Sequence, residues 1–79
     1  MKATDPIVFP GDRVQVENYK AHTIEKPIEP ASVVEVKTIW LSPKKCLHQY
    51  LVKLDRQLKG RPILLSVNER RIREKITVS

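Results

Sequence analysis

The residue types that could do catalytic or metal chemistry are few, and they come close together at only one place. Cys46 and His48 are two residues apart, so both side chains would share one face of a strand, whereas His22 lies far away in the sequence. A zinc site needs about four ligands, and a catalytic cysteine needs a base and an orienting third group. The pair supplies only half of either site, so we predict no bound metal, no cofactor and no enzymatic activity.

Positive charge is the strongest chemical signal in the chain. There are 15 Lys and Arg against nine Asp and Glu, which gives a net charge of +6. Residues 1–40 hold five basic and six acidic residues, whereas residues 41–79 hold ten and three, so the whole excess lies in the second half. Such an excess favours acidic partners. The basic residues expected to form the binding surface are Lys44, Lys45, Lys53, Arg56, Lys59, Arg61, Arg70, Arg71 and Arg73.

Two kinds of acidic partner fit this charge. The first is nucleic acid, whose phosphates Lys and Arg neutralise, with an exposed Trp40 or Tyr50 available to stack on an unpaired base. The second is an acidic protein, for which the chain would be a docking module. We place nucleic acid first. The charge can also serve solubility alone, and self-association through an edge strand is a third possibility, so the oligomeric state stays open.

Size and composition limit the remaining classes. A chain of 79 residues has a small core and little room for a catalytic cleft, so we predict no small-molecule substrate. The single cysteine excludes an internal disulfide framework. No apolar run reaches the roughly 18–20 residues of a membrane span. The sequence therefore predicts one small domain in the cytoplasm.

Alternation of polar and apolar residues predicts a series of short strands. These are expected at residues 13–17, 32–41, 46–55 and 61–67. In the first two strands Val14, Val16, Val34 and Val36 are expected to point inward. Trp40 is expected in the core because it ends a strongly apolar strand and large aromatic side chains dominate burial in small domains. The inward residues of the next two strands are expected to be Tyr50, Val52, Leu54, Ile63, Leu65 and Val67.

A long loop and an ambiguous C-terminal segment complete the pattern. Residues 18–30 are polar and contain two prolines, which predicts an extended loop of more than the usual length. Near the end of the chain, Ser66 and Glu69 fit a capping box and therefore a short helix. A 3-10 turn at 68–71 before a last strand agrees better with the β-rich context. In that strand the inward residues would be Ile72, Ile76 and Val78.

Four segments resemble those of a known group of small β-proteins. They are Pro10–Val16, Val33–Val36, Tyr50–Leu54 and Val67–Ile72. On these residues the chain resembles the SH3-like barrels, which include ribosome-associated modules of the KOW type, integrase C-terminal domains and small accessory subunits of photosynthetic electron transport. The strands and turns alone fit a small antiparallel barrel or two packed sheets, and the turn signal at residues 10–12 sets residues 1–9 apart as a flexible lead-in. The resemblance implies an all-β fold, a small five-stranded antiparallel SH3-like barrel at residues 10–79. It implies no site residues.

The same resemblance bears on the two candidate partners. A KOW-type module would carry a glycine in the loop between its first two strands, and none lies between Gly11 and Gly60. RNA binding of that particular kind is therefore not expected. The accessory subunits imply the docking alternative, in which a basic face meets an acidic protein in a larger complex, for example of electron-transport type.

Overall fold

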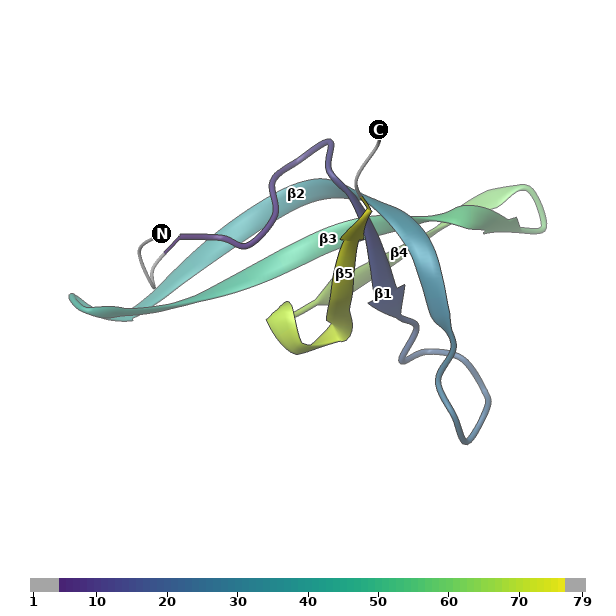
Figure 1. Cartoon of the computed structure of the whole chain (residues 1–79), viewed down its shortest axis with the longest axis horizontal. Helices are drawn as coiled ribbons and strands as arrows, with labels where there is room; N and C mark the ends of the chain where they lie inside the picture. Colours follow the sequence, from purple (N-terminus) through teal and green to yellow (C-terminus); the bar gives the residue numbers. More distant parts are fainter. Residues whose placement is uncertain (1–4, 77–79) are drawn as a thin grey trace.

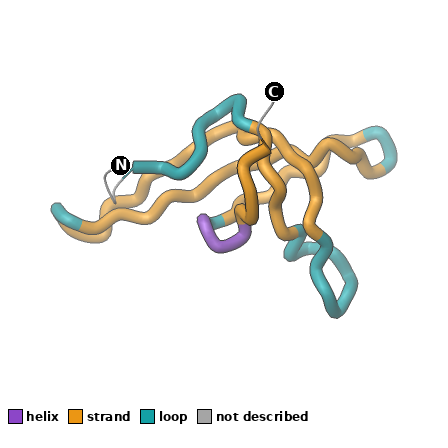
Figure 2. The backbone as a smooth tube through the Cα atoms, viewed as in Figure 1, coloured by secondary structure: helices purple, strands orange, loops and turns teal. Residues whose placement is uncertain are grey.

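Five antiparallel strands form one twisted sheet in the computed structural model, which describes residues 5–76 (Figures 1 and 2). The elements are β1 (Arg13–Glu17), β2 (Ile28–Ser42), β3 (Lys45–Leu58), β4 (Arg61–Val67), the 3-10 turn η1 (Glu69–Arg71) and β5 (Ile72–Ile76). The all-β class, the five strands and the late 3-10 turn are confirmed. The sheet order is β4-β3-β2-β1-β5, so β4 and β5 are its edges and hydrogen bonding does not close the predicted barrel. No helix in the described part could cross a membrane.

A bulge in β2 explains why one predicted strand face is wrong. Val33 lies opposite Val52 and Glu35 lies opposite the preceding residue of β3, so Val34 is an extra residue that bulges from the ladder. One inserted residue moves every later side chain to the other face. Val33 is therefore in the core and Val34 is exposed, contrary to prediction, whereas Val36 beyond the bulge is partly buried against the core.

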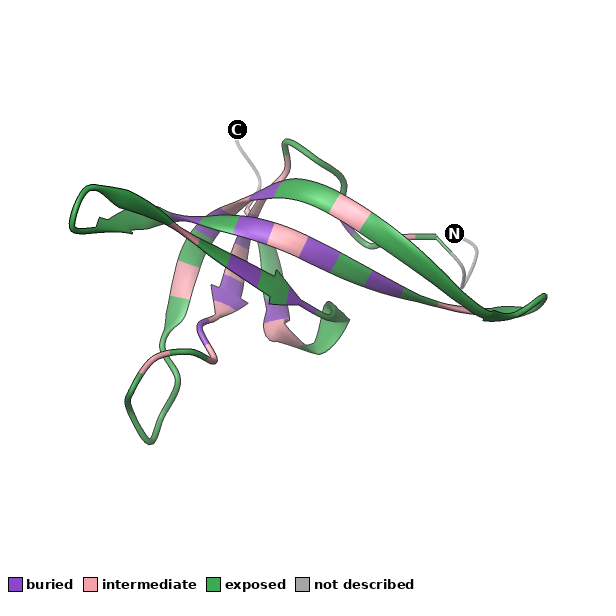
Figure 3. Ribbon diagram, turned by 180° about the vertical axis from the view of Figure 1, so that it is seen from behind, coloured by how far each residue is buried: buried purple, intermediate pink, exposed green. Residues whose placement is uncertain are grey.

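The core gathers where the strands overlap in the middle of the sheet (Figure 3). Its buried members are Val8, Val14, Val16, Ala31, Val33, Tyr50, Val52, Leu54, Leu65, Val67 and Ile72. Seven of the residues predicted to point inward from β1, β3 and β4 are among them, and Ile63 is partly buried. Ile76 is partly exposed, and Val78 lies outside the described residues.

Residues 5–9 of the lead-in expected at 1–9 lie against the sheet, and residues 1–4 are outside the described residues. Val8 is part of the core, and the Ile7 amide donates a hydrogen bond of 3.0 Å to the Tyr50 hydroxyl. The Gly11 amide donates to the Val33 carbonyl at 2.9 Å, so the segment continues beside β2. Burial raises the pKa of the Tyr50 hydroxyl, which keeps it neutral and able to donate to Glu69 at 3.3 Å.

The loop between β1 and β2 contacts β4 and η1, which are not paired with β1 in the sheet, through the side chain of Tyr19. The loop spans residues 18–27, shorter than predicted, because β2 already begins at Ile28. The Tyr19 ring packs against the core, and its hydroxyl donates to the Ser66 carbonyl of β4 at 3.0 Å. The Arg71 guanidinium lies 4.5 Å from the centre of the same ring. Tyr19 therefore connects the end of β1 to β4 and to η1.

Two hairpins project from the body of the sheet in opposite directions, along a molecule that measures 43 × 32 × 22 Å (Figure 1). Along β2, the pairing with β1 covers residues 28–32, and along β3 the pairing with β4 covers residues 50–58. Residues 37–49 are thus paired only with one another, and we call them the β2–β3 ribbon. The second projection is the β3–β4 hairpin, with its turn at Lys59 and Gly60.

Candidate nucleic-acid interface

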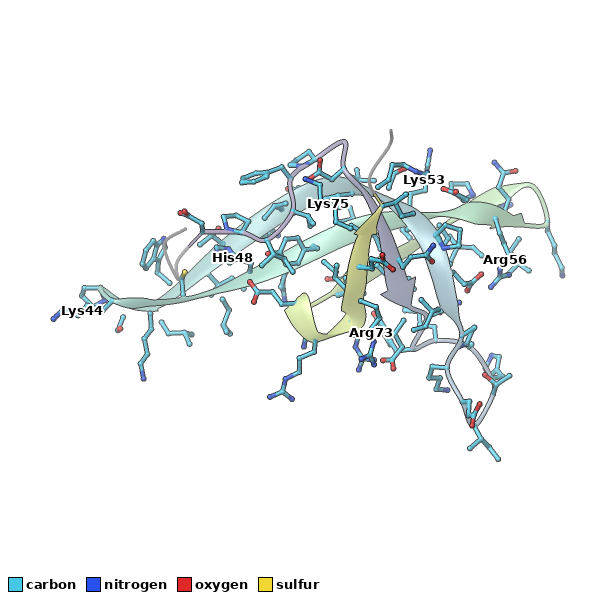
Figure 4. All side chains as sticks on the ribbon, in the orientation of Figure 1. Lys44, His48, Lys53, Arg56, Arg73 and Lys75 are labelled. Atoms are coloured by element: carbon cyan, nitrogen blue, oxygen red, sulfur yellow. The ribbon has the colours of Figure 1, made fainter. Side chains whose placement is uncertain are left out.

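The nine basic residues predicted to bind an acidic partner do not lie together. Lys44 and Lys45 lie at the tip of the β2–β3 ribbon, whereas Lys59 and Arg61 lie at the tip of the β3–β4 hairpin, at the other end of the molecule (Figures 1 and 4). Lys53 lies on the outer face of β3, between the two tips. The remaining four are Arg56 near the end of β3, Arg70 and Arg71 in η1, and Arg73 in β5.

Three of the nine are held in ion pairs that join neighbouring elements. Arg56 of β3 donates through Nε to Glu29 of β2 at 2.5 Å, and Arg71 and Arg73 contact the two carboxylate oxygens of Glu17 in β1 at 2.6 and 3.0 Å. The hydrogen bond from Arg56 lowers the pKa of Glu29. Because their charge is matched by carboxylates, these three arginines are better suited to holding the sheet together than to meeting a partner.

The other six have no ion pair with any residue at positions 5–76; they are Lys44, Lys45, Lys53, Lys59, Arg61 and Arg70. Arg70 is the exposed arginine of η1, and it lines two shallow depressions of about 240 and 210 Å³ on either side of that turn. Among these cations, Lys44 and Lys45 differ from the others because large exposed apolar side chains lie near them on the same ribbon.

The β2–β3 ribbon leaves its apolar side chains in solvent. Trp40 is 58% exposed, Leu41 62% and Leu47 54%. The prediction that Trp40 lies in the core is wrong, because neither β1 nor β4 reaches far enough to cover the ribbon. Ile39 lies opposite Leu47 on one face of the ribbon and Trp40 opposite Cys46 on the other, so both faces carry apolar groups.

The ribbon is also free of negative charge. No Asp or Glu occurs between Glu35 and Asp55, a stretch that contains Lys37, Lys44 and Lys45 of the ribbon and Lys53 beyond it. All four lysines are exposed. The sequence contains the signal for this surface, namely an apolar run that ends in a proline and two lysines. Such a run predicts a strand that is either buried on both faces or bent, because β-strands that are apolar on both faces are usually covered.

His48 lies near the base of the ribbon (Figure 4), and Cys46 lies closer to the tip, opposite Trp40. The Cys46 sulfur is 3.8 Å from Nε2 of His48, whose Nδ1 is 3.0 Å from the Thr38 hydroxyl. His48 is buried, and it borders the depression that Arg70 lines. Within residues 5–76 no group of three or more His, Cys, Asp and Glu side chains is placed to hold a metal ion. Within the described residues, the pair therefore supplies only two of the roughly four ligands that a zinc site needs.

Comparison with known proteins adds no relative. No family model matches this chain, and neither a curated protein nor a solved structure matches it.

Proposed function

We propose that the protein is a non-catalytic cytoplasmic module with an SH3-like fold that binds nucleic acid, mainly through phosphate contacts. The observation that carries the proposal is the β2–β3 ribbon, where three lysines, of which Lys44 and Lys45 have no carboxylate near them in the sequence, accompany a tryptophan that is 58% exposed. Lysines supply phosphate contacts, and an exposed indole supplies a flat apolar surface for bases. The tip of the β3–β4 hairpin has a similar charge and no aromatic side chain, so the ribbon is the stronger candidate.

A second candidate is docking to an acidic protein in a larger complex. The exposed Leu41 and Leu47 favour it, because aliphatic side chains beside cations are common in protein interfaces. Against it stands the two-faced exposure of the ribbon, because a docking patch normally occupies one face. A groove of a nucleic-acid duplex has a wall on each side and can contact both faces of the ribbon. We therefore keep nucleic acid as the first proposal.

Charge reversal at the two hairpin tips tests the proposal. Lys44→Glu/Lys45→Glu and Lys59→Glu/Arg61→Glu change the net charge equally, at opposite ends of the molecule. Fluorescence anisotropy with a labelled duplex should show a loss of affinity of at least about tenfold for the first variant and a much smaller loss for the second. For the unmodified protein, three phosphate contacts predict a loss of roughly 40-fold between about 50 and about 200 mM salt.

The control ligand is polyglutamate, which offers carboxylates without bases or phosphates. Weaker binding of polyglutamate than of the duplex would support the proposal. Equal losses for both double variants would show that only the overall charge matters and would contradict a site on the ribbon. Binding of polyglutamate with no detectable binding of duplex or single strand would replace the proposal with the docking alternative.

A further inference from the structure

The β2–β3 ribbon has dimensions that suit a groove of double-stranded DNA. From Lys37 to the turn at Pro43 it extends seven residues, or about 20 Å at the rise of an antiparallel strand. Two strands about 4.8 Å apart, with their side chains, make a bar about 10 Å across. No third strand of the described chain pairs with it. This bar is wider than the minor groove of straight B-DNA, about 6 Å, so only its tip can enter that groove, at a step that a kink has opened, while the five-stranded body stays outside.

Apolar side chains are concentrated where the ribbon would enter first. The ladder pairs Trp40 with Cys46 and Ser42 with Lys45, so Leu41 is an extra residue that bulges from the ribbon next to the turn. Trp40, Leu41, Ser42 and Pro43 line one open hollow of about 420 Å³. Leucine, proline and similar apolar groups are the side chains that proteins wedge between base steps from the minor groove.

The ribbon offers few groups that read base edges. It contains no Arg or Asn and one Gln, Gln49, at the end away from the tip, and its cations are lysines, which contact phosphates as point charges. Such a surface binds by charge and by deforming the duplex, with little dependence on sequence.

We infer, on the basis of the proposed function, that the tip of the β2–β3 ribbon enters the minor groove of duplex DNA and kinks it by inserting Leu41, with Trp40 against the exposed step. Lys44 and Lys45 contact phosphates beside the kink, and Lys37 contacts a phosphate nearer the body. The cost of unstacking is a few kcal/mol per step and is offset by the added contacts along the bent duplex.

Two other partners agree less well with the ribbon. Single strands are bound by several aromatic side chains in succession, whereas the ribbon carries only Trp40. An anionic membrane attracts lysines to its surface, but here Lys44 lies in the turn itself. Insertion of the apolar tip would carry its ammonium group into the hydrocarbon first, which is costly.

The test measures binding and bending on the same samples. A duplex of about 30 base pairs carries a donor and an acceptor dye at its ends, so that a kink of about 20–90° raises energy transfer. Leu41→Ser removes the inserted side chain and leaves every lysine in place. Leu58→Ser is the matched control, because Leu58 is a similarly exposed leucine next to a cation at the other hairpin tip.

We expect the unmodified protein and Leu58→Ser to raise energy transfer to the same degree, and Leu41→Ser to lose most of that rise while its affinity falls by no more than about threefold. Binding without any change in energy transfer would overturn the kink and leave the proposed function standing. Tighter binding to the single strand than to the duplex would also overturn it. If neither form of DNA binds, the inference and the proposed function both fail.

Discussion

The cationic side chains of this protein divide into two groups according to whether a carboxylate lies within reach. Arg56 reaches Glu29, and Arg13 forms a bidentate pair with Asp55. In such pairs the planar guanidinium matches the carboxylate and joins two strands. Lys44 at the ribbon tip has no such partner among the described residues, so its charge is available to a ligand.

The paired carboxylates predict how stability depends on pH. Hydrogen bonds from Arg56 and Arg13 lower the pKa of Glu29 and of Asp55 below their ordinary values of 4.5 and 3.8. The unfolded chain therefore binds more protons than the folded one in the acid range, and the free energy of unfolding must fall as the pH drops from about 4.5 through the lowered values. Urea unfolding between neutral and acid pH measures this fall.

Arg56→Gln should make that fall shallower, because the pKa of Glu29 then returns toward its ordinary value. Lys45→Gln is the control, because it removes a β3 cation that has no ion pair in the described part of the chain and does not contribute to the lowered pKa of Glu29 or Asp55. The same pH dependence for Arg56→Gln as for the unmodified protein would contradict a stabilising role for the ion pair.

At the scale of single residues, the sequence identifies the cations but not their partners. A lysine and an arginine count equally toward the net charge, and contacts such as that of Arg71 with Glu17 join positions 54 apart in the chain. Only the antiparallel placement of β5 beside β1 brings the two together. Substitution of Arg70, Arg71 and Arg73 together would therefore disturb the fold as well as the surface, and the ribbon lysines make the better test.

Among the elements, strands bounded by strong turn signals are the ones that the sequence predicts well. The predicted bounds of β1 and β4 match the structure, because a Pro-Gly turn precedes the first and Lys59-Gly60 precedes the second. The bounds of β2 and β3 are less accurate. The bulge at Val34 depends on cross-strand pairing, and no local pattern announces it.

The turn between β3 and β4 gives a prediction at this scale. Lys59 and Gly60 both have positive φ, 51° and 75°, as in the type I′ turns that favour Asn-Gly. Lys59→Asn should therefore stabilise the protein by about 0.5–1 kcal/mol, because asparagine tolerates the left-handed region better than lysine does. Gly60→Ala should destabilise it by about 1–2 kcal/mol through backbone strain.

A Cβ on Gly60 would meet no heavy atom within 4 Å, so any loss in Gly60→Ala reports the backbone conformation and not a steric clash. Thermal or urea unfolding of the two variants measures both effects. Stabilities that change in the same direction for both variants would show that the turn does not have this conformation in solution.

At the scale of the whole molecule, a small core lies between two projecting hairpins. Burial is complete in the centre of the sheet and is lost toward both tips (Figure 3). The sequence predicts the composition of that centre, because alternation identifies the inward residues of β1, β3 and β4. It does not predict that the ribbon is exposed. Whether an apolar strand segment is covered depends on how far the other strands of the sheet extend, and the local sequence does not give that length. Trp40 is exposed because β1 and β4 end before they reach the ribbon.

The measurement that tests nucleic-acid binding by the ribbon most directly is the emission of Trp40, the single tryptophan of the chain. Addition of duplex DNA should quench this emission and shift its maximum to shorter wavelength, because the exposed indole becomes stacked and shielded from water. The change should saturate together with the anisotropy of the labelled duplex and should reverse as salt is raised. Duplex binding that leaves the Trp40 emission unchanged would contradict a site on the β2–β3 ribbon.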